Sequence, residues 1–90
     1  MTEETLHFRV QALRRVAERG VATAAIRQIL AGGDAVVAFP EEGERIVLGW
    51  AGGCPLHVQA ADQAGATLVL SVYEPQARSW TGGFRWRAGG

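Results

Sequence analysis

The sequence predicts an α+β fold in which two N-terminal helices pack on one face of a four-stranded antiparallel sheet. The main observation is the stretch from Arg45 to Pro75, where two turn-forming clusters separate three runs of β-branched and aliphatic residues, as in an antiparallel meander. The second observation is the helical spacing of apolar residues in the first third of the chain. Helices followed by strands are typical of a layered α+β arrangement.

Apolar residues alternate with other residues along each run of the meander. Successive side chains on a strand point to opposite faces, so each run has one apolar side. A fourth strand is expected over residues 35–39, followed by a turn at residues 40–43 that glutamates make acidic. We expect the helices to cover an apolar face formed by Ile46, Leu48, Trp50, Leu56, Val58, Ala60, Leu68, Leu70 and Val72.

The other face of the meander is predicted to gather polar side chains. If the stretches D-Q-A-G-A and A-G-G close the two hairpins, His57 lies opposite Ser71 and Val47. A slip of one residue in either turn would break this grouping, because it moves every side chain of a strand to the opposite face. The predicted polar face consists of Arg45, His57, Gln59, Ser71 and Tyr73.

The first helix is expected over residues 3–19, with an apolar stripe made by Leu6, Val10, Leu13 and Ala17. An alternative is open, because Phe8 lies on the otherwise polar side of this helix. In the alternative, Thr5–Val10 form a short strand and the helix begins only near Gln11. A second helix is expected from Thr23 to the glycines at positions 32 and 33.

Polar residues at intervals of four line the opposite flank of the longer first helix: His7, Gln11, Arg15 and Arg19. One interpretation is a solvated helix face. The other is a ladder of donors that hold phosphates, because guanidinium groups match phosphate oxygens in pairs.

Composition and charge narrow the classes of function. The 90 residues make one domain, and nine cationic side chains balance nine carboxylates, so polyanion binding has to come from local clustering. A single cysteine, Cys54, and two distant histidines predict no metal site and no cofactor. No stretch is apolar and long enough to span a bilayer, and the start T-E-E is unlike a secretory signal. We therefore expect a cytoplasmic protein without a membrane partner.

Residues 76–90 differ in character from the meander. Arginines, among them Arg85, are interleaved with Trp80, Phe84 and Trp86, and such a pattern can stack bases and hold phosphates. The structural interpretation is that Trp80 closes the end of the core, while the segment from Phe84 to Arg87 adds an edge strand or forms a flexible tail.

Three motifs in order resemble a family of small bacterial domains, domain-of-unknown-function family 4258. Q-A-L-R-R-V-A-E-R-G-V, from Gln11 to Val21, resembles its opening helix H-A-x-x-R-M-x-x-R-G-I. L-G-W-A-G-G-C-P-L-H-V, from Leu48 to Val58, resembles its L-G-x-x-x-G-x-P-L-H-V, and S-V-Y-E-P before Trp80 is similar to its T-V-Y-x-P before a tryptophan. The family is thought to be similar to the RelE and MqsR superfamily of ribonuclease toxins, which are paired with antitoxins. The resemblance therefore implies a RelE-like fold with one side facing RNA.

The resemblance also implies roles for individual positions. Arg15 and Arg19 match the two helix arginines, His57 matches the P-L-H histidine, and Tyr73 matches the V-Y-x-P tyrosine. The helix histidine of the family is Gln11 here, and glutamine cannot shuttle a proton near neutral pH. On the longer helix, a histidine one turn earlier, at position 7, can take its place.

Two functions follow from these motifs. The first is the toxin of a type II toxin–antitoxin system, acting as a metal-independent RNA endonuclease that needs a base, an acid and cations around the phosphorane. Its catalytic candidates are His57, Tyr73 and Arg15, and its RNA-binding candidates are Arg19, Arg45, Gln11 and Arg85. The second is a noncatalytic module of the same fold, degenerate at Gln11, that binds RNA or a protein partner.

Overall fold

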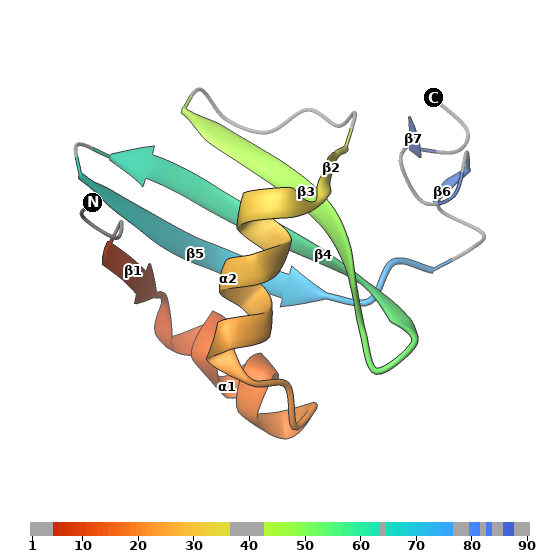
Figure 1. Cartoon of the computed structure of the whole chain (residues 1–90), viewed down its shortest axis with the longest axis horizontal. Coiled ribbons are helices and arrows are strands. Elements are labelled where there is room, and N and C mark those ends of the chain that lie inside the picture. Colours follow the sequence, from red (N-terminus) through yellow and green to blue (C-terminus); the bar gives the residue numbers. More distant parts are fainter. Residues whose placement is uncertain are drawn as a thin grey trace.

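A five-stranded mixed sheet and two helices make up the fold in the computed structural model (Figure 1), which describes residues 5–36, 43–63, 65–76, 80–81, 83 and 86–87. The strands lie in the order β1-β5-β4-β3-β2, and β1 pairs parallel with β5 while the other neighbours are antiparallel. The elements are β1 Thr5–Phe8, α1 Val10–Glu18, α2 Thr23–Gly32, β2 Asp34–Ala35, β3 Glu44–Ala51, β4 Cys54–Gln63, β5 Ala66–Tyr73, β6 Trp80–Thr81 and β7 Trp86–Arg87.

The predicted α+β class and the meander are present, but the sheet differs from the prediction in two ways. It has a fifth strand, β1, and that strand makes the sheet mixed instead of antiparallel. β6 and β7 pair with each other as a separate two-stranded sheet, so the segment near Arg87 is not an edge of the main sheet. The packing role expected of Trp80, and most of the expected strand and turn at residues 35–43, fall outside the described part.

The expected helix over residues 3–19 is wrong, and the alternative of a short initial strand is confirmed. In β1, Leu6 and Phe8 are half-buried and pack against the core, while Thr5 and His7 are exposed. This alternation has the period of a strand. At Arg9 the backbone is still extended, and α1 begins at Val10. His7 therefore lies on β1 and not on a helix flank with Gln11.

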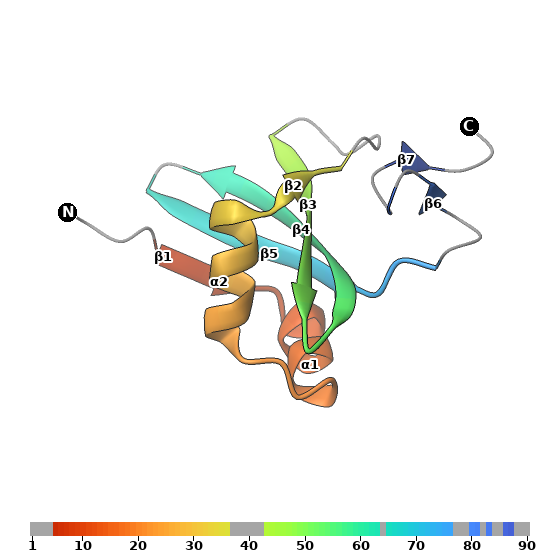
Figure 2. The same cartoon turned by 45° about the vertical axis from the view of Figure 1, so that its right-hand side comes forward.

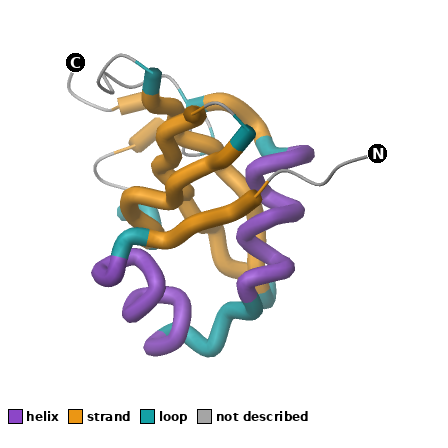
Figure 3. The backbone as a smooth tube through the Cα atoms, turned by 90° about the vertical axis from the view of Figure 1, so that its left-hand side faces the viewer, coloured by secondary structure: helices purple, strands orange, loops and turns teal. Residues whose placement is uncertain are grey.

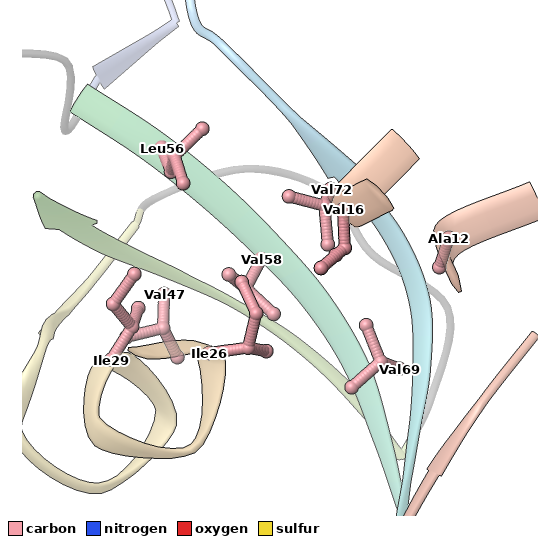
Figure 4. Close-up of a cluster of buried hydrophobic side chains, with 9 residues drawn as sticks. All are labelled: Ala12, Val16, Ile26, Ile29, Val47, Leu56, Val58, Val69 and Val72. Atoms are coloured by element: carbon pink, nitrogen blue, oxygen red, sulfur yellow. The ribbon is translucent and has the colours of Figure 1, made fainter. Parts of the chain in front are cut away.

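The two helices pack on the sheet (Figures 2 and 3), α2 against β3 and β4 and α1 against β5 and β1. Both contribute to one apolar cluster. The side chains of the cluster interdigitate between the helices and the strands (Figure 4). Its buried members are Ala12, Val16, Ile26, Ile29, Val47, Leu56, Val58, Val69 and Val72.

The buried stripe of α1 is not the predicted one. Ala12 and Val16 are buried, whereas Val10 and Leu13 are 71% and 48% exposed. The phase differs because β1 and the extended residue Arg9 set where the helix begins and which side meets β5. Of the expected stripe, Val10, Leu13 and Ala17 are exposed, and Leu6 lies on β1 instead.

The register of the meander differs from the expected one by one residue in β3. The β3–β4 hairpin is closed by Gly52 and Gly53 alone, both with positive φ, as two-residue hairpin turns require. Leu48 is consequently opposite His57, and Val47 is opposite Val58. Every side chain of β3 is thereby on the face opposite to the predicted one.

The pairing of β4 with β5 also differs from the expected register, because it contains a β-bulge. The pairing of β4 with β5 shifts between Gln59 and Ala60, so Tyr73 lies directly opposite His57, and Ser71 lies opposite Gln59. The extra residue of a bulge is accommodated on one strand only. Tyr73, and not Ser71 as predicted, is thus the direct cross-strand neighbour of His57.

Candidate functional site

A cleft of about 570 Å³ lies between α1 and the end of β5. β1 pairs with β5 only as far as Val69, because the chain turns away at Arg9 to begin α1. Past that point the last residues of β5 face the polar flank of α1. The cleft is lined by Gln11, Ala12, Arg14, Arg15, Glu18, Leu70, Ser71, Val72 and Tyr73.

The helix side of the cleft is mainly cationic. Arg14 and Arg15 are exposed, and within the described part of the chain neither forms an ion pair. Glu18, one turn further along, is the one carboxylate in the lining. Arg19, at the end of α1, instead binds Glu74 at a distance of 3.1 Å between Nη1 and Oε2. The two arginines of the lining are therefore available to an anionic ligand.

His57 and Tyr73 form a pair on the face of the sheet opposite to the main apolar cluster. The imidazole Nδ1 and the phenol oxygen are 3.2 Å apart, and the two rings meet edge to face with centroids 5.3 Å apart. His57 is 0% exposed. Tyr73 is half-buried and lines the cleft. A ligand in the cleft can therefore reach Tyr73, whereas His57 is buried and does not line the cleft.

Neighbouring polar side chains on this face form hydrogen bonds with one another. Ser71 donates a hydrogen bond to the amide oxygen of Gln59 at 3.0 Å, and the amide nitrogen of Gln59 donates to Glu44 at 2.7 Å. These bonds join β5, β4 and β3 across the sheet. They orient Ser71 at the border of the cleft.

Arg45 is not part of this face, which corrects the predicted grouping. The shifted register places it on the helix side, where Nε and Nη2 donate to the two carboxylate oxygens of Asp62 at 2.7 and 3.1 Å. Nη1 also donates to the carbonyl of Leu30 in the last turn of α2, at 3.2 Å. Arg45 thus ties α2 to the sheet.

Asp62 has an altered acidity because of this contact. The hydrogen bond from Arg45 holds the pKa of the Asp62 carboxyl below its ordinary value of 3.8. A hydrogen bond from Thr67 and the charge of Arg45 act in the same direction, while partial burial opposes them. The group is a structural ion pair.

The structure brings together some of the predicted site residues and separates others. Gln11, Arg15 and Tyr73 line one cleft, and His57 lies behind Tyr73. Arg19 and Arg45 are engaged by carboxylates. Arg85 lies outside the described residues. Sequence reasoning missed Arg14, although its position beside Arg15 in the R-R pair was a signal.

The part of the chain that the structure describes has neither a membrane-spanning helix nor a metal-ligand cluster. No helix there has the length and apolar character that crossing a bilayer requires. No three His, Cys, Asp or Glu side chains in that part come together as the ligands of a metal ion.

Comparisons with protein-family profiles, with curated proteins and with solved structures found no match.

Proposed function

We propose that this chain is an RNA-binding domain and that the cleft between α1 and β5 holds the RNA. The observation that carries the proposal is the pair Arg14 and Arg15, which line the cleft and have no carboxylate partner within the described part of the chain. Guanidinium groups bind phosphate oxygens in a planar, two-pronged geometry. A cleft with two such groups can hold a phosphodiester backbone.

The other lining residues support RNA over a simple anion. Gln11 and Ser71 offer neutral donors and acceptors, which suit hydroxyl groups and base edges. Tyr73 adds an aromatic ring, and single-stranded RNA is commonly bound by stacking its bases on such rings. The motif resemblance to a toxin-like family implies the same ligand class.

A binding experiment tests this function. Fluorescence anisotropy with a labelled single-stranded RNA compares the wild type with Arg14→Gln and Arg15→Gln, and with Arg27→Gln on α2 as the matched control. Each cleft arginine that contacts a phosphate contributes about 0.7 to the slope of log K against log salt. We expect both cleft variants to bind more weakly and to show that reduction in slope. Equal affinity for all three variants and the wild type would contradict the proposal.

A second candidate function is RNA cleavage, and the contact between Tyr73 and His57 favours it. A metal-independent endonuclease takes the proton of the ribose 2′-hydroxyl, the oxygen attacks phosphorus, and the departing 5′-oxygen receives a proton. In this candidate, Tyr73 would transfer one of these protons and solvent water would transfer the other, and His57 would act as a positioning residue. Arg15 would stabilise the charge on the phosphorane.

Induced expression in a bacterial host separates the two candidates. A toxin of this class would arrest growth, Arg15→Ala and Tyr73→Phe would relieve the arrest, and an antitoxin protein would be its natural partner. Purified protein would also cleave RNA in the presence of a chelator. Unimpaired growth together with intact RNA would remove the catalytic candidate, while RNA binding would stand on its own measurement.

A further inference from the structure

Three hydrogen-bonded side chains form a polar relay across the face of the sheet that carries His57 and Tyr73. The relay begins at Glu44 on β3, passes through Gln59 on β4 and ends at Ser71 on β5. All three side chains are half-buried. Ser71 is the member of the relay that also lines the α1–β5 cleft.

The carboxylate at one end fixes the direction of every hydrogen bond in the relay. An ionised carboxylate only accepts, so the amide nitrogen of Gln59 donates to Oε1 of Glu44 at 2.7 Å. The remaining polar atom of the amide is its carbonyl oxygen, which also only accepts. The hydroxyl of Ser71, 3.0 Å from that oxygen, therefore gives its one proton to Gln59.

The relay presents a fixed acceptor to the cleft. A serine hydroxyl has one proton and two lone pairs, and the proton of Ser71 is engaged within the sheet. Ser71 can accept a hydrogen bond from a ligand without losing its bond to Gln59, whereas donating to a ligand would break that bond. Arg14 and Arg15 have the opposite property, because guanidinium groups only donate. A ligand that fits both walls needs anionic acceptors for α1 and a donor for β5.

The ribose 2′-hydroxyl is the group of an RNA strand that supplies such a donor in every nucleotide. A phosphodiester carries a negative charge and no proton, and the donors of the bases change from one base to the next. The 2′-hydroxyl both donates and accepts, and DNA lacks it. Glu18 is a second acceptor in the lining, but its charge repels a phosphate held by the arginines beside it.

We propose that Ser71, with its proton engaged by Gln59, accepts a hydrogen bond from a ribose 2′-hydroxyl and makes the α1–β5 cleft selective for RNA over DNA. Gln59 and Glu44 are positioning residues in this arrangement. The inference rests on the proposed function, because it concerns a strand whose phosphates Arg14 and Arg15 bind.

Fluorescence anisotropy with three labelled single strands tests the selectivity. The strands share one sequence without uracil or thymine and differ at the 2′ position: RNA, 2′-fluoro RNA, which keeps an RNA-like sugar without the donor, and DNA. A net neutral hydrogen bond corresponds to about two- to twelvefold in affinity. We expect the wild type to bind RNA more tightly than either other strand by that factor. Ser71→Ala should bind RNA and 2′-fluoro RNA equally.

Two further variants test the acceptor and the relay. Glu18→Gln removes the competing carboxylate, so it should bind all strands more tightly and keep their ratio. Gln59→Leu frees the proton of Ser71, which can then turn toward the ligand, so the preference for RNA should shrink. Thermal melts show whether each variant is folded.

The results separate this inference from RNA binding itself. Equal wild-type affinity for RNA and 2′-fluoro RNA, with both weakened by Arg14→Gln, would overturn the selectivity and leave the RNA-binding function standing. A full preference in folded Ser71→Ala, or its loss in Glu18→Gln, would overturn the role of Ser71. An undiminished preference in folded Gln59→Leu would overturn the role of the relay. A chain that binds none of the strands would contradict the proposed function as well.

Discussion

Removing the hydroxyl of Tyr73 isolates the contact on which the catalytic candidate depends. Tyr73→Phe keeps the ring, which packs beside a small cluster of Val36, Ile46 and Leu48, and deletes only the oxygen 3.2 Å from Nδ1 of His57. Because His57 is 0% exposed, water cannot readily replace the lost partner. A buried polar group that loses a hydrogen-bond partner costs about 1–3 kcal/mol. We expect the free energy of unfolding to fall by about 1–2 kcal/mol.

Thermal denaturation followed by circular dichroism measures this loss. In a domain of this size the melting temperature falls by about 4–8 °C per kcal/mol, so the expected decrease is about 5–15 °C. Ser71→Ala is the control, because it deletes a hydroxyl bond at a half-buried position on the same strand and should cost less than about 1 kcal/mol.

The outcome separates structural from catalytic roles. Unchanged stability of Tyr73→Phe would refute the inference that this hydrogen bond stabilises the fold. A stability loss with unchanged RNA affinity and no cleavage in the wild type would assign the pair a structural role alone. Loss of a cleavage activity present in the wild type would assign Tyr73 to proton transfer.

Three further outcomes are expected. Gly49→Ala should destabilise the protein by about 1–3 kcal/mol in thermal melts, because the added Cβ collides with an isoleucine of α2. Gly32→Ala is the control and should not destabilise it, because its added Cβ points into open space. Similar melting temperatures for the two variants would contradict this packing. The ion pair of Asp62 is partly exposed and should contribute only about 0.2–1 kcal/mol. Because the pKa of Asp62 is lowered by folding, this contribution is complete above pH 3.8 and is lost as the pH falls through the lowered value. The free energy of unfolding of Asp62→Asn should therefore depend less steeply on pH in the acid range than that of the wild type. An equal dependence on pH would show that the ion pair contributes nothing. If Arg14 and Arg15 are the two phosphate contacts, a fourfold rise in salt should weaken RNA binding about sevenfold, and a salt-independent affinity would point to a protein ligand instead.

Local patterns predicted the three central strands of the main sheet but not the faces on which their side chains lie. Alternation in the stretch from Arg45 to Pro75 identified β3, β4 and β5. Whether the β3–β4 turn has two or three residues cannot be read from A-G-G, and that single residue moved Arg45 from the side of His57 to the side of the helices. A bulge, which has no sequence signature here, then brought Tyr73 opposite His57.

The N-terminal prediction failed for a different reason. A four-residue strand such as β1 is stabilised by a partner far along the chain, and helical periodicity over the same residues suggests a longer helix. The candidate site was partly predictable nonetheless. Gln11 and Arg15 share a helix flank in either interpretation, because spacing by four survives a change in where the helix begins. The burial of His57 depends on what covers the second face of the sheet, and alternation does not show this.

The pairing of β1 with β5 has a consequence for how the chain reaches its native state. The meander joins neighbours in sequence, so β3, β4 and β5 can assemble early, whereas Thr5 must find Ala66 across most of the polypeptide. Closing such a long loop carries a large entropic penalty, and it sets a slow step. The order of assembly should be visible in amide exchange, with β1 protected last during refolding and released first on partial unfolding.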